Sequence, residues 1–335
     1  MLADAARWTV LALAVRALLF VLVLPHPERW IRADSGDYLR LGANLAAGAG
    51  FSKAEAPPFG PETARTPVYP LFLAGLRILF GPSLVPVALA QILISAAACG
   101  LTYLLGLRLF SAAAARLGAL LQVFCLGSIL YSDLIMTETL FSFLLLGMLA
   151  GVARGCAGAG RRWFVAAGIL GGVAILCRPI ALLFPVILAV AMMDADWRGR
   201  ETRASAGGRP EERTRRRTRL VPVLLMLSAA AAVVLPWIAR NQRVLGRPAV
   251  SSLDAYNLLY YEAAPLEARV EHAGEDEIRA ELARSVETDL PRAGSLSARD
   301  RAMRGLALRI IREHPVRFVE VHLQGCLPAL LVTVG

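Results

Sequence analysis

The sequence contains a single lysine, Lys53, although it is strongly basic. The other 35 of its 36 basic residues are arginines, and the formal net charge is +10. We interpret the shortage of lysine as a compositional bias without functional meaning. The arginines lie mostly between apolar runs, a pattern that orients membrane proteins and differs from the clustered basic face of a nucleic-acid-binding domain. No nucleic-acid partner is therefore expected.

Residues that build metal centres and disulfide frameworks are also few. The five cysteines are scattered singly, and the four histidines lack metal-ligand spacing. We expect the cysteines to be small buried hydrophobes and predict no protein-held metal. The sequence also lacks a phosphate-binding Gly-rich loop, a dinucleotide fingerprint and a Ser-His-Asp arrangement, so the common soluble enzyme classes are not indicated.

Charged residues are scarce, at 19% of the chain, whereas 56% of the residues are hydrophobic and the mean hydropathy is +0.55. This composition disfavours a soluble domain. Several apolar runs approach the roughly 20 residues that a helix needs to cross a bilayer, and they lack the alternation of a membrane barrel. The predicted fold class is an all-α integral membrane protein, a multi-span helical bundle.

Nine apolar runs divide the chain. They are Trp8 to Pro25, Val68 to Phe80, Leu84 to Leu107, Ala112 to Tyr131, Leu140 to Val152, Trp163 to Leu176, Ile180 to Met193, Leu220 to Ile238 and Val316 to Gly335. The first is not followed by a cleavage pattern, which indicates an uncleaved span. The run Val68 to Phe80 has 13 residues and carries Arg77, so we predict an interfacial helix at 68–80 and about eight spans in the remaining runs.

This assignment fixes a topology. Arg108, Arg116, Arg154, Arg161, Arg162 and the basic loop 194–219 then share one side, which the positive-inside rule makes cytoplasmic. The loop 194–219 has nine arginines against five acidic residues and is predicted to be a disordered connector. If 68–80 crossed the membrane instead, these basic clusters would lie on opposite sides, so the interfacial assignment is preferred.

Two polar segments then lie outside, a first outer loop at 25–67 and a second outer loop at 240–315. The second contains a predicted amphipathic helix, Ser297 to Glu313, whose apolar residues recur at helical spacing. Ser297 followed by Asp300 resembles a capping box at its start. The loop is therefore expected to be helical, with its own small core.

Five segments in order resemble one family of membrane enzymes. They are RADSGDYLRLGANLAAGAGFS, PETARTPVYPLFLAGL, LIMTETLFSFLLLG, GILGGVAILCRPIALLFP and LPWIARNQRVLGRPAVSS. Together they resemble the GT-C glycosyltransferases that use polyprenyl-phosphate sugars, a group that includes protein O-mannosyltransferases and aminoarabinose transferases of lipid A. The resemblance covers nearly the whole chain and implies a GT-C-like domain over 1–335.

The resemblance implies that Asp34, four residues before Tyr38, is the catalytic base and that Tyr38 helps to bind the substrate. A carboxylate there can take the proton from an acceptor hydroxyl as that hydroxyl attacks the anomeric carbon. Many relatives have Glu where this chain has Ser35, and Asp37 is a candidate to replace that second carboxylate. The alternative is that both aspartates solvate the loop and cap the helix Gly36 to Ala47.

Arginines are predicted to bind the phosphate of the lipid carrier, because guanidinium groups make charge-assisted paired contacts with phosphate. Arg65 stands where the family has a basic residue before its Pro motif. Arg178 lies between two apolar runs on the outer side, against the positive-inside trend, and an interfacial Arg without a ligand is the alternative. Arg240 is a similar, weaker candidate.

Other polar residues are secondary candidates. Glu138 matches an acidic residue that faces the family's site, where it would orient Arg65 or the acceptor, and helix capping is the alternative. Asn257 resembles a polar residue of the late outer loop. Three nearby tyrosines, Tyr256, Tyr260 and Tyr261, are interpreted as an interfacial belt in preference to a sugar-stacking platform.

Two charges near the apolar runs carry separate expectations. Arg16 lies inside the first run, where a lone charge costs about 2.5–3.5 kcal/mol, so it is predicted to have a partner within the bundle. Asp133 is predicted to be a solvated loop residue. Neither is assigned to the chemistry.

The resulting functional prediction is a bacterial inner-membrane glycosyltransferase that works at the outer face, with inversion at the anomeric carbon. Its donor is a polyprenyl-phosphate-linked sugar, its acceptor is a lipid, glycan or protein, and its surroundings are membrane lipid. No other cofactor is assigned, and the role of a divalent cation stays open. A transporter or flippase and an inactive scaffold relative are the alternatives. The final apolar run stops at Gly335, so a C-terminally truncated chain is expected.

Overall fold

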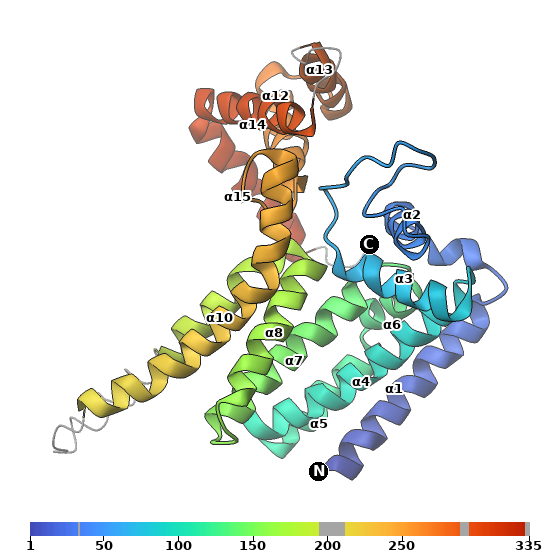
Figure 1. Cartoon of the computed structure of the whole chain (residues 1–335), viewed down its shortest axis with the longest axis vertical. Coiled ribbons are helices and arrows are strands. Elements are labelled where there is room, and N and C mark those ends of the chain that lie inside the picture. The colour runs from blue at the N-terminus through green and yellow to red at the C-terminus, as the bar shows by residue number, and fades with distance from the viewer. Residues whose placement is uncertain (33, 194–211, 289–294, 332–335) are drawn as a thin grey trace. The chain divides into compact units, whose positions relative to one another are not determined.

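The computed structural model describes residues 1–32, 34–193, 212–288 and 295–331. All regular structure in these ranges is helical, which confirms the predicted all-α class. The chain forms two compact units, coloured along the chain in Figure 1. The first contains Met1–Glu62 and Thr66–Trp237, and the second contains Thr63–Arg65 and Ile238–Gly335.

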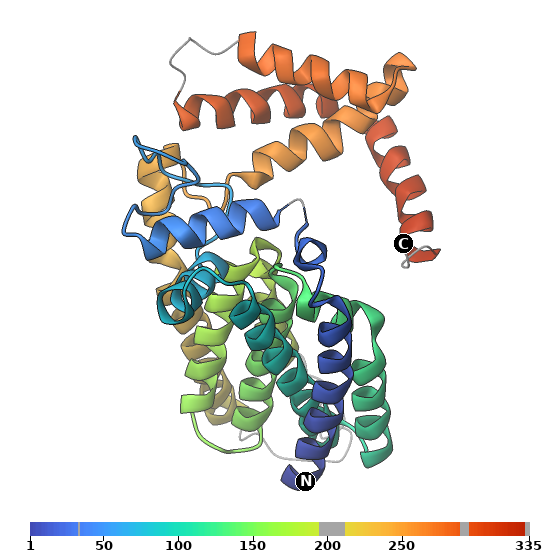
Figure 2. The same ribbon diagram turned by 90° about the vertical axis from the view of Figure 1, so that its right-hand side faces the viewer.

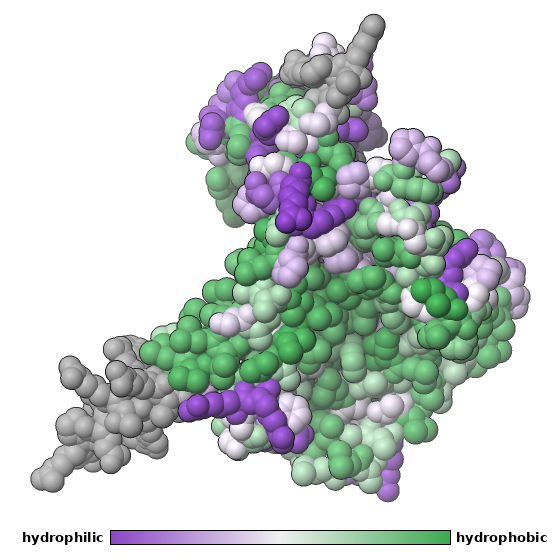
Figure 3. Space-filling view, viewed as in Figure 1, coloured by the Kyte–Doolittle hydropathy of each residue, from purple (hydrophilic) through white to green (hydrophobic). Residues whose placement is uncertain are grey.

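The first unit is a bundle of apolar helices that run alongside one another (Figures 1 and 2). Its long members are α1 (Leu2–Val23), α4 (Val85–Leu109), α5 (Ala112–Phe124), α7 (Glu138–Cys156), α8 (Arg162–Cys177), the helical segment Pro179–Met193 and the first part of α10 (Glu212–Leu245). Helix α4 packs against α1, α5 and α7, and α7 packs against α8. Figure 3 shows an apolar surface over these helices, as expected for lipid contact.

In the described part of the chain, four helices are long and apolar enough to cross a membrane, namely Leu2–Val23, Val85–Leu109, Glu138–Cys156 and Leu220–Leu245. A fifth span is formed if α5 and α6 (Leu126–Asp133), which meet at an angle of 49°, count together. The predicted count of about eight is not confirmed. Helix α8 and the segment Pro179–Met193 are short because Pro179 interrupts the helical hydrogen bonding between them. The last predicted run includes residues 332–335, which lie outside the described part.

Helix α3 (Val68–Phe80) has the bounds predicted from the sequence. It follows Pro67 and ends at Gly81, whose φ of 79° is a left-handed conformation that glycine adopts without strain. Both α3 and α2 (Ser35–Ala46) lie across one end of the bundle, whereas the long helices run along it (Figures 1 and 2). The side of the membrane that this end faces stays a prediction.

The connections α4–α5 and α7–α8 lie together at the opposite end of the bundle (Figure 1). There Arg108 Nε donates a hydrogen bond to Ala153 O at 3.2 Å, and the Arg154 guanidinium lies 4.4 Å from the centre of the Trp163 ring. Of the basic loop 194–219, residues 194–211 lie outside the described part. Residues 212–219 are helical and begin α10, so the prediction of a disordered connector is wrong for them.

Arg16 has the partners that its position in an apolar helix requires. Its side chain is fully buried, and it donates to Ser95 Oγ at 2.7 Å and to Ser128 Oγ at 2.9 Å. It also donates to the carbonyls of Gln122 and Val123, both at 3.4 Å, in the last turn of α5. The bend between α5 and α6 exposes these carbonyls, and the negative end of the helix dipole favours a cation there.

Asp133 is not the solvated loop residue that the sequence suggested. Its side chain is 3% exposed, and among the described residues neither of its carboxylate oxygens has a hydrogen-bond partner. The prediction failed because α6 continues two residues beyond the apolar run and carries Asp133 into the bundle. The charge of Arg16 attracts this carboxylate.

The second unit is built from shorter helices after α10. They are α11 (Leu253–Asn257), a π-helix (Leu258–Ala263), α12 (Ala264–Glu271), α13 (Glu275–Thr288), α14 (Leu296–Glu313) and α15 (Pro315–Leu331). Their shared core includes Leu259, Leu266, Leu282, Met303 and Ile310. The helical character and the core that the sequence predicted for residues 240–315 are therefore present in the described residues of this segment.

The start of α14 differs from the prediction. Its N-cap is Ser295, whose hydroxyl accepts a hydrogen bond from Ala298 N. The proposed capping box of Ser297 and Asp300 is wrong, because Asp300 is buried and binds Arg247 instead. The helix therefore begins one residue earlier than the sequence pattern suggested.

Helices α8 and α10 approach most closely at two glycines spaced four residues apart. A Cβ on Gly168 would lie 2.1 Å from Met226 O, and one on Gly172 would lie 2.9 Å from Ala230 O. Small residues at this spacing let helix backbones pack closely in a membrane. The contact therefore depends on the absence of a side chain.

We predict that Gly168→Ala lowers the unfolding temperature of the detergent-solubilised protein, because overpacking costs about 1–3 kcal/mol. Gly75→Ala is the matched control, since its Cβ meets nothing within 4 Å on α3. Alanine there should stabilise the helix slightly. Equal unfolding temperatures for both variants and the wild type would contradict the close α8–α10 contact.

Candidate active site

Asp34 lies at the start of α2, as predicted. It is half-buried, and its backbone carbonyl accepts a hydrogen bond from Tyr38 N at 3.4 Å. Asp34 is the N-cap residue, but its side chain makes no capping hydrogen bond. The capping alternative for this carboxylate is therefore not what the geometry shows.

The turn that carries Asp34 is fixed to a distant segment by buried hydrogen bonds. Ser35 Oγ accepts from Arg32 N and donates to Ile135 O, both at 2.9 Å. Ile135 N in turn donates to Trp30 O at 2.8 Å. Ser35 therefore holds the backbone beside Asp34 in place.

Glu138 and Arg178 form an ion pair at the same end of the bundle. Arg178 Nη1 also donates to Thr137 Oγ1 at 3.1 Å. Arg178 follows the last residue of α8 in an extended conformation, which turns it away from the helix. Because Ile135 contacts the Asp34 turn, the short segment 135–138 contacts both candidate elements.

Lys53 joins two carboxylates of the first outer loop. Its Nζ lies 3.2 Å from Asp37 Oδ2 and 2.9 Å from Glu62 Oε2. Burial lowers the pKa of Lys53, but the hydrogen bonds and charges of Glu62 and Asp37 outweigh it, so the pKa is raised. Asp37 is thus paired with Lys53. The sequence did not indicate a role for Lys53, although it is the only lysine in the chain.

Tyr38 is nine-tenths buried and packs edge-on against Tyr69, with ring centroids 5.2 Å apart. Tyr69 donates a hydrogen bond to Gln91 Oε1 at 2.7 Å, and Gln91 Nε2 donates to Leu134 O at 2.6 Å. The Tyr38 ring therefore holds α2 against α3. The contact of Tyr38 with substrate stays a prediction.

Arg65 belongs to the second unit, whereas Asp34, Glu138 and Arg178 belong to the first. The segment before it is held to the stretch after α10. Ser252 N donates to Thr63 O at 2.9 Å, and Ser251 Oγ donates to Ala64 O at 2.5 Å. The convergence of Arg65 with the other three side chains stays a prediction.

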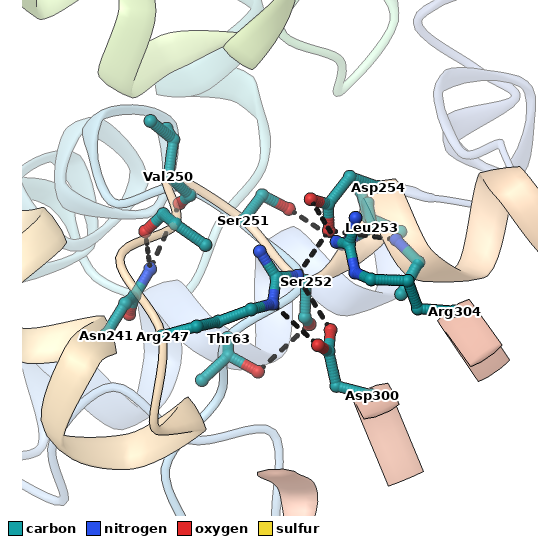
Figure 4. A network of polar contacts seen from close by, with 12 residues as sticks. Thr63, Asn241, Arg247, Val250, Ser251, Ser252, Leu253, Asp254, Asp300 and Arg304 are labelled. Atoms are coloured by element: carbon teal, nitrogen blue, oxygen red, sulfur yellow. Dashed lines mark hydrogen bonds and ion pairs between the residues drawn. The ribbon is translucent and has the colours of Figure 1, made fainter. Parts of the chain in front are cut away.

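Asn241 supports this stretch and was not singled out from the sequence. It is fully buried, and its Nδ2 donates to the carbonyls of Ala249 and Val250 at 3.0 and 3.1 Å (Figure 4). Its Oδ1 accepts from Arg240 Nη1 at 2.8 Å. Arg240 is therefore placed next to the segment that holds Arg65.

A second polar network fixes α14 to the residues after α10 (Figure 4). Arg247 makes a paired contact with the buried Asp300, at 2.6 and 2.8 Å, and also donates to Asp254 Oδ1 at 2.6 Å. Arg304 donates to Asp254 Oδ2 at 2.7 Å. The hydrogen bonds with Asp300 raise the pKa of Arg247 above its ordinary value. Burial raises the pKa of Asp254, but the two arginines outweigh it and lower the pKa.

The aromatic residues of the second unit gather around the π-helix. Tyr256 lies 4.6 Å from Tyr260 and 6.2 Å from Tyr261, measured between ring centroids. Asn257 is exposed beside them at the end of α11. A π-helix is often found at a functional position, and no sequence pattern indicated it.

The described residues include no group of three or more His, Cys, Asp or Glu side chains that could hold a metal ion. The part of a divalent cation in the reaction therefore stays open.

Residues 64–205 match the family model described as dolichyl-phosphate-mannose-protein mannosyltransferase. The matched range contains Arg65, Glu138 and Arg178, while Asp34 precedes it and Arg240 follows it. Comparisons with curated proteins and with solved structures found no match. Over residues 64–205 the chain is thus similar to these mannosyltransferases, which confirms the predicted resemblance to the GT-C glycosyltransferases.

Proposed function

We propose that this membrane protein transfers a sugar from a polyprenyl-phosphate carrier to an acceptor hydroxyl at the outer face of a bacterial inner membrane. The observation that carries the proposal is the family match, because it includes Arg65, Glu138 and Arg178. The structure adds that Glu138 and Arg178 pair at the bundle end that also holds the Asp34 turn. The sugar and the acceptor class are not assigned.

Asp34 is the proposed general base. Its turn is held by Ser35 and Trp30, so the carboxylate begins α2 from a fixed backbone. A base in this position takes the acceptor proton while the acceptor oxygen attacks the anomeric carbon and the bond to the carrier phosphate breaks. One displacement of this kind inverts the anomeric configuration.

Arg178 is the proposed partner of the leaving phosphate. Its contacts with Glu138 and Thr137 both use Nη1. A guanidinium carries five N–H donors, and Nε with Nη2 forms the edge suited to a paired phosphate contact. Glu138 would orient this edge. Arg65 is the second proposed phosphate ligand, held by Ser251 and Ser252 through the residues before it.

A transporter is the alternative function favoured by one observation, the bent span α5–α6. Broken helices near the membrane centre form substrate sites in many transporters. Here, however, Arg16 donates to the carbonyls of the α5 terminus, as a fixed cation of the protein itself. The break therefore has a structural explanation, and we favour the transferase.

We predict that Asp34→Asn lowers sugar transfer by about 10²-fold or more, the usual size of a general-base contribution, and leaves donor binding unchanged. Asp37→Asn is the matched control, because it removes a contact of Lys53 that Glu62 also makes. Turnover of this control should change only a few-fold. If Asp34→Asn kept wild-type turnover and Asp37→Asn lost it, the general base would be Asp37. If neither substitution changed turnover, a scaffold or a transporter would be favoured over the transferase.

We predict that Arg178→Lys weakens donor binding by roughly tenfold or more, because an ammonium cannot make the paired contact of a guanidinium. Binding of a radiolabelled polyprenyl-phosphate sugar to the protein in nanodiscs measures this directly. Arg154→Lys, at the opposite end of the bundle, is the matched control and should bind the donor normally. Unchanged donor affinity in Arg178→Lys would remove Arg178 from the phosphate site.

A further inference from the structure

A cavity of about 410 Å³ opens at the bundle end opposite the candidate active site. It is lined by Asp4, Arg7, Trp8, Leu11, Tyr103 and Arg116. These residues come from α1, α4 and α5, near the chain's first residue (Figures 1 and 2). None of them belongs to the proposed transferase site.

Helix α4, which contributes Tyr103 to the cavity, packs closely against its two neighbours. A Cβ on Gly100 would lie 2.3 Å from Thr9 Oγ1 of α1, and one on Gly106 would lie 2.7 Å from Ala115 Cα of α5. Helices α1 and α5 therefore flank α4 closely. Between them, Trp8 and Tyr103 lie with ring centroids 6.3 Å apart and form an aromatic wall.

The cavity carries more positive than negative charge. Arg7 and Arg116 are both exposed, and Asp4 is the only acidic residue of the lining. Asp4 Oδ1 lies 3.2 Å from Arg7 Nη1, and Asp4 Oδ2 lies 3.2 Å from the N-terminal ammonium of Met1, so this carboxylate is shared between two cations. The lining then has a net charge of +1, and its two guanidinium groups suit a phosphate anion.

The walls continue as apolar helix surface. Leu11 on α1 is 40% exposed, and Leu120, one turn beyond Arg116 on α5, is 42% exposed. The two arginines and the two aromatic rings are thus followed along the helices by exposed leucines. A phospholipid has the same order, because its charged headgroup is followed by its acyl chains. A soluble phosphate compound would not need this apolar continuation.

We propose that this cavity binds the phosphodiester headgroup of an anionic phospholipid, whose acyl chains lie along α1 and α5. Arg7 and Arg116 contact the phosphate, and Trp8 and Tyr103 lie at the level of the glycerol backbone. The bound lipid would join the first span to α5. This inference does not depend on the proposed transferase activity.

Binding of phosphatidylglycerol and phosphatidylcholine with identical acyl chains to the full chain in detergent, counted by native mass spectrometry, tests the proposal. We expect phosphatidylglycerol to bind at least about tenfold more tightly. The double variant R7Q/R116Q should lose that preference. R161Q/R162Q is the matched control, with the same charge change at the same bundle end, and should keep it.

Three results would overturn the proposal. Equal binding of the two lipids by the wild-type chain would show that the headgroup charge is not recognised. Equal loss of the preference for phosphatidylglycerol in both double variants would show that the basic bundle end attracts anionic lipid diffusely, without a defined site. Displacement of phosphatidylglycerol by inorganic phosphate at equal concentration would assign the cavity to a free phosphate. The first and third measurements use the wild type, so they hold even if R7Q/R116Q fails to fold.

Discussion

The hydrogen bonds of the segment from Ser132 to Glu138 hold together several elements at one end of the bundle. Its carbonyls at Ser132 and Leu134 accept both hydrogens of the buried Gln91 amide, and Ile135 pairs with the Asp34 turn. Thr137 and Glu138 hold Arg178. These contacts connect the turn at Asp34 to the end of α8. A preorganised carboxylate and cation are what a displacement at an anomeric carbon needs.

Deeper in the bundle, burial of charge imposes a second constraint. Arg16 is satisfied by two hydroxyls and by the carbonyls at the end of α5, and its charge acts on the buried Asp133. The bend between α5 and α6 exposes the carbonyl groups that Arg16 of α1 binds, and Arg16 in turn satisfies these carbonyl groups. An apolar residue at Arg16 would leave buried carbonyls and a carboxylate without compensation, which is costly in a membrane.

Local sequence patterns predicted the helical class and the bounds of α3. The sequence also singled out Glu138 and Arg178 as candidates, and the structure brings these two side chains together. Local patterns could not predict contacts that join distant segments. Lys53 with Asp37, and Arg247 with Asp300, involve ordinary polar loop residues whose pairing depends on the tertiary fold. The predicted span count is not confirmed, because the runs Trp163 to Leu176 and Ile180 to Met193 form helices that are shorter than a typical span. The prediction that Asp133 is a solvated loop residue was wrong because α6 extends past its apolar run.

The most direct test of the central claim is to supply the purified protein in nanodiscs with a radiolabelled polyprenyl-phosphate mannose and a mixture of hydroxyl acceptors. Released polyprenyl phosphate and the anomeric configuration of the glycosylated product are both measured. We expect one carrier phosphate to be released per sugar transferred, with inverted configuration. Transfer with retained configuration would contradict a single displacement by an acceptor that Asp34 activates. No carrier release with mannose or any other donor sugar would contradict the transferase itself.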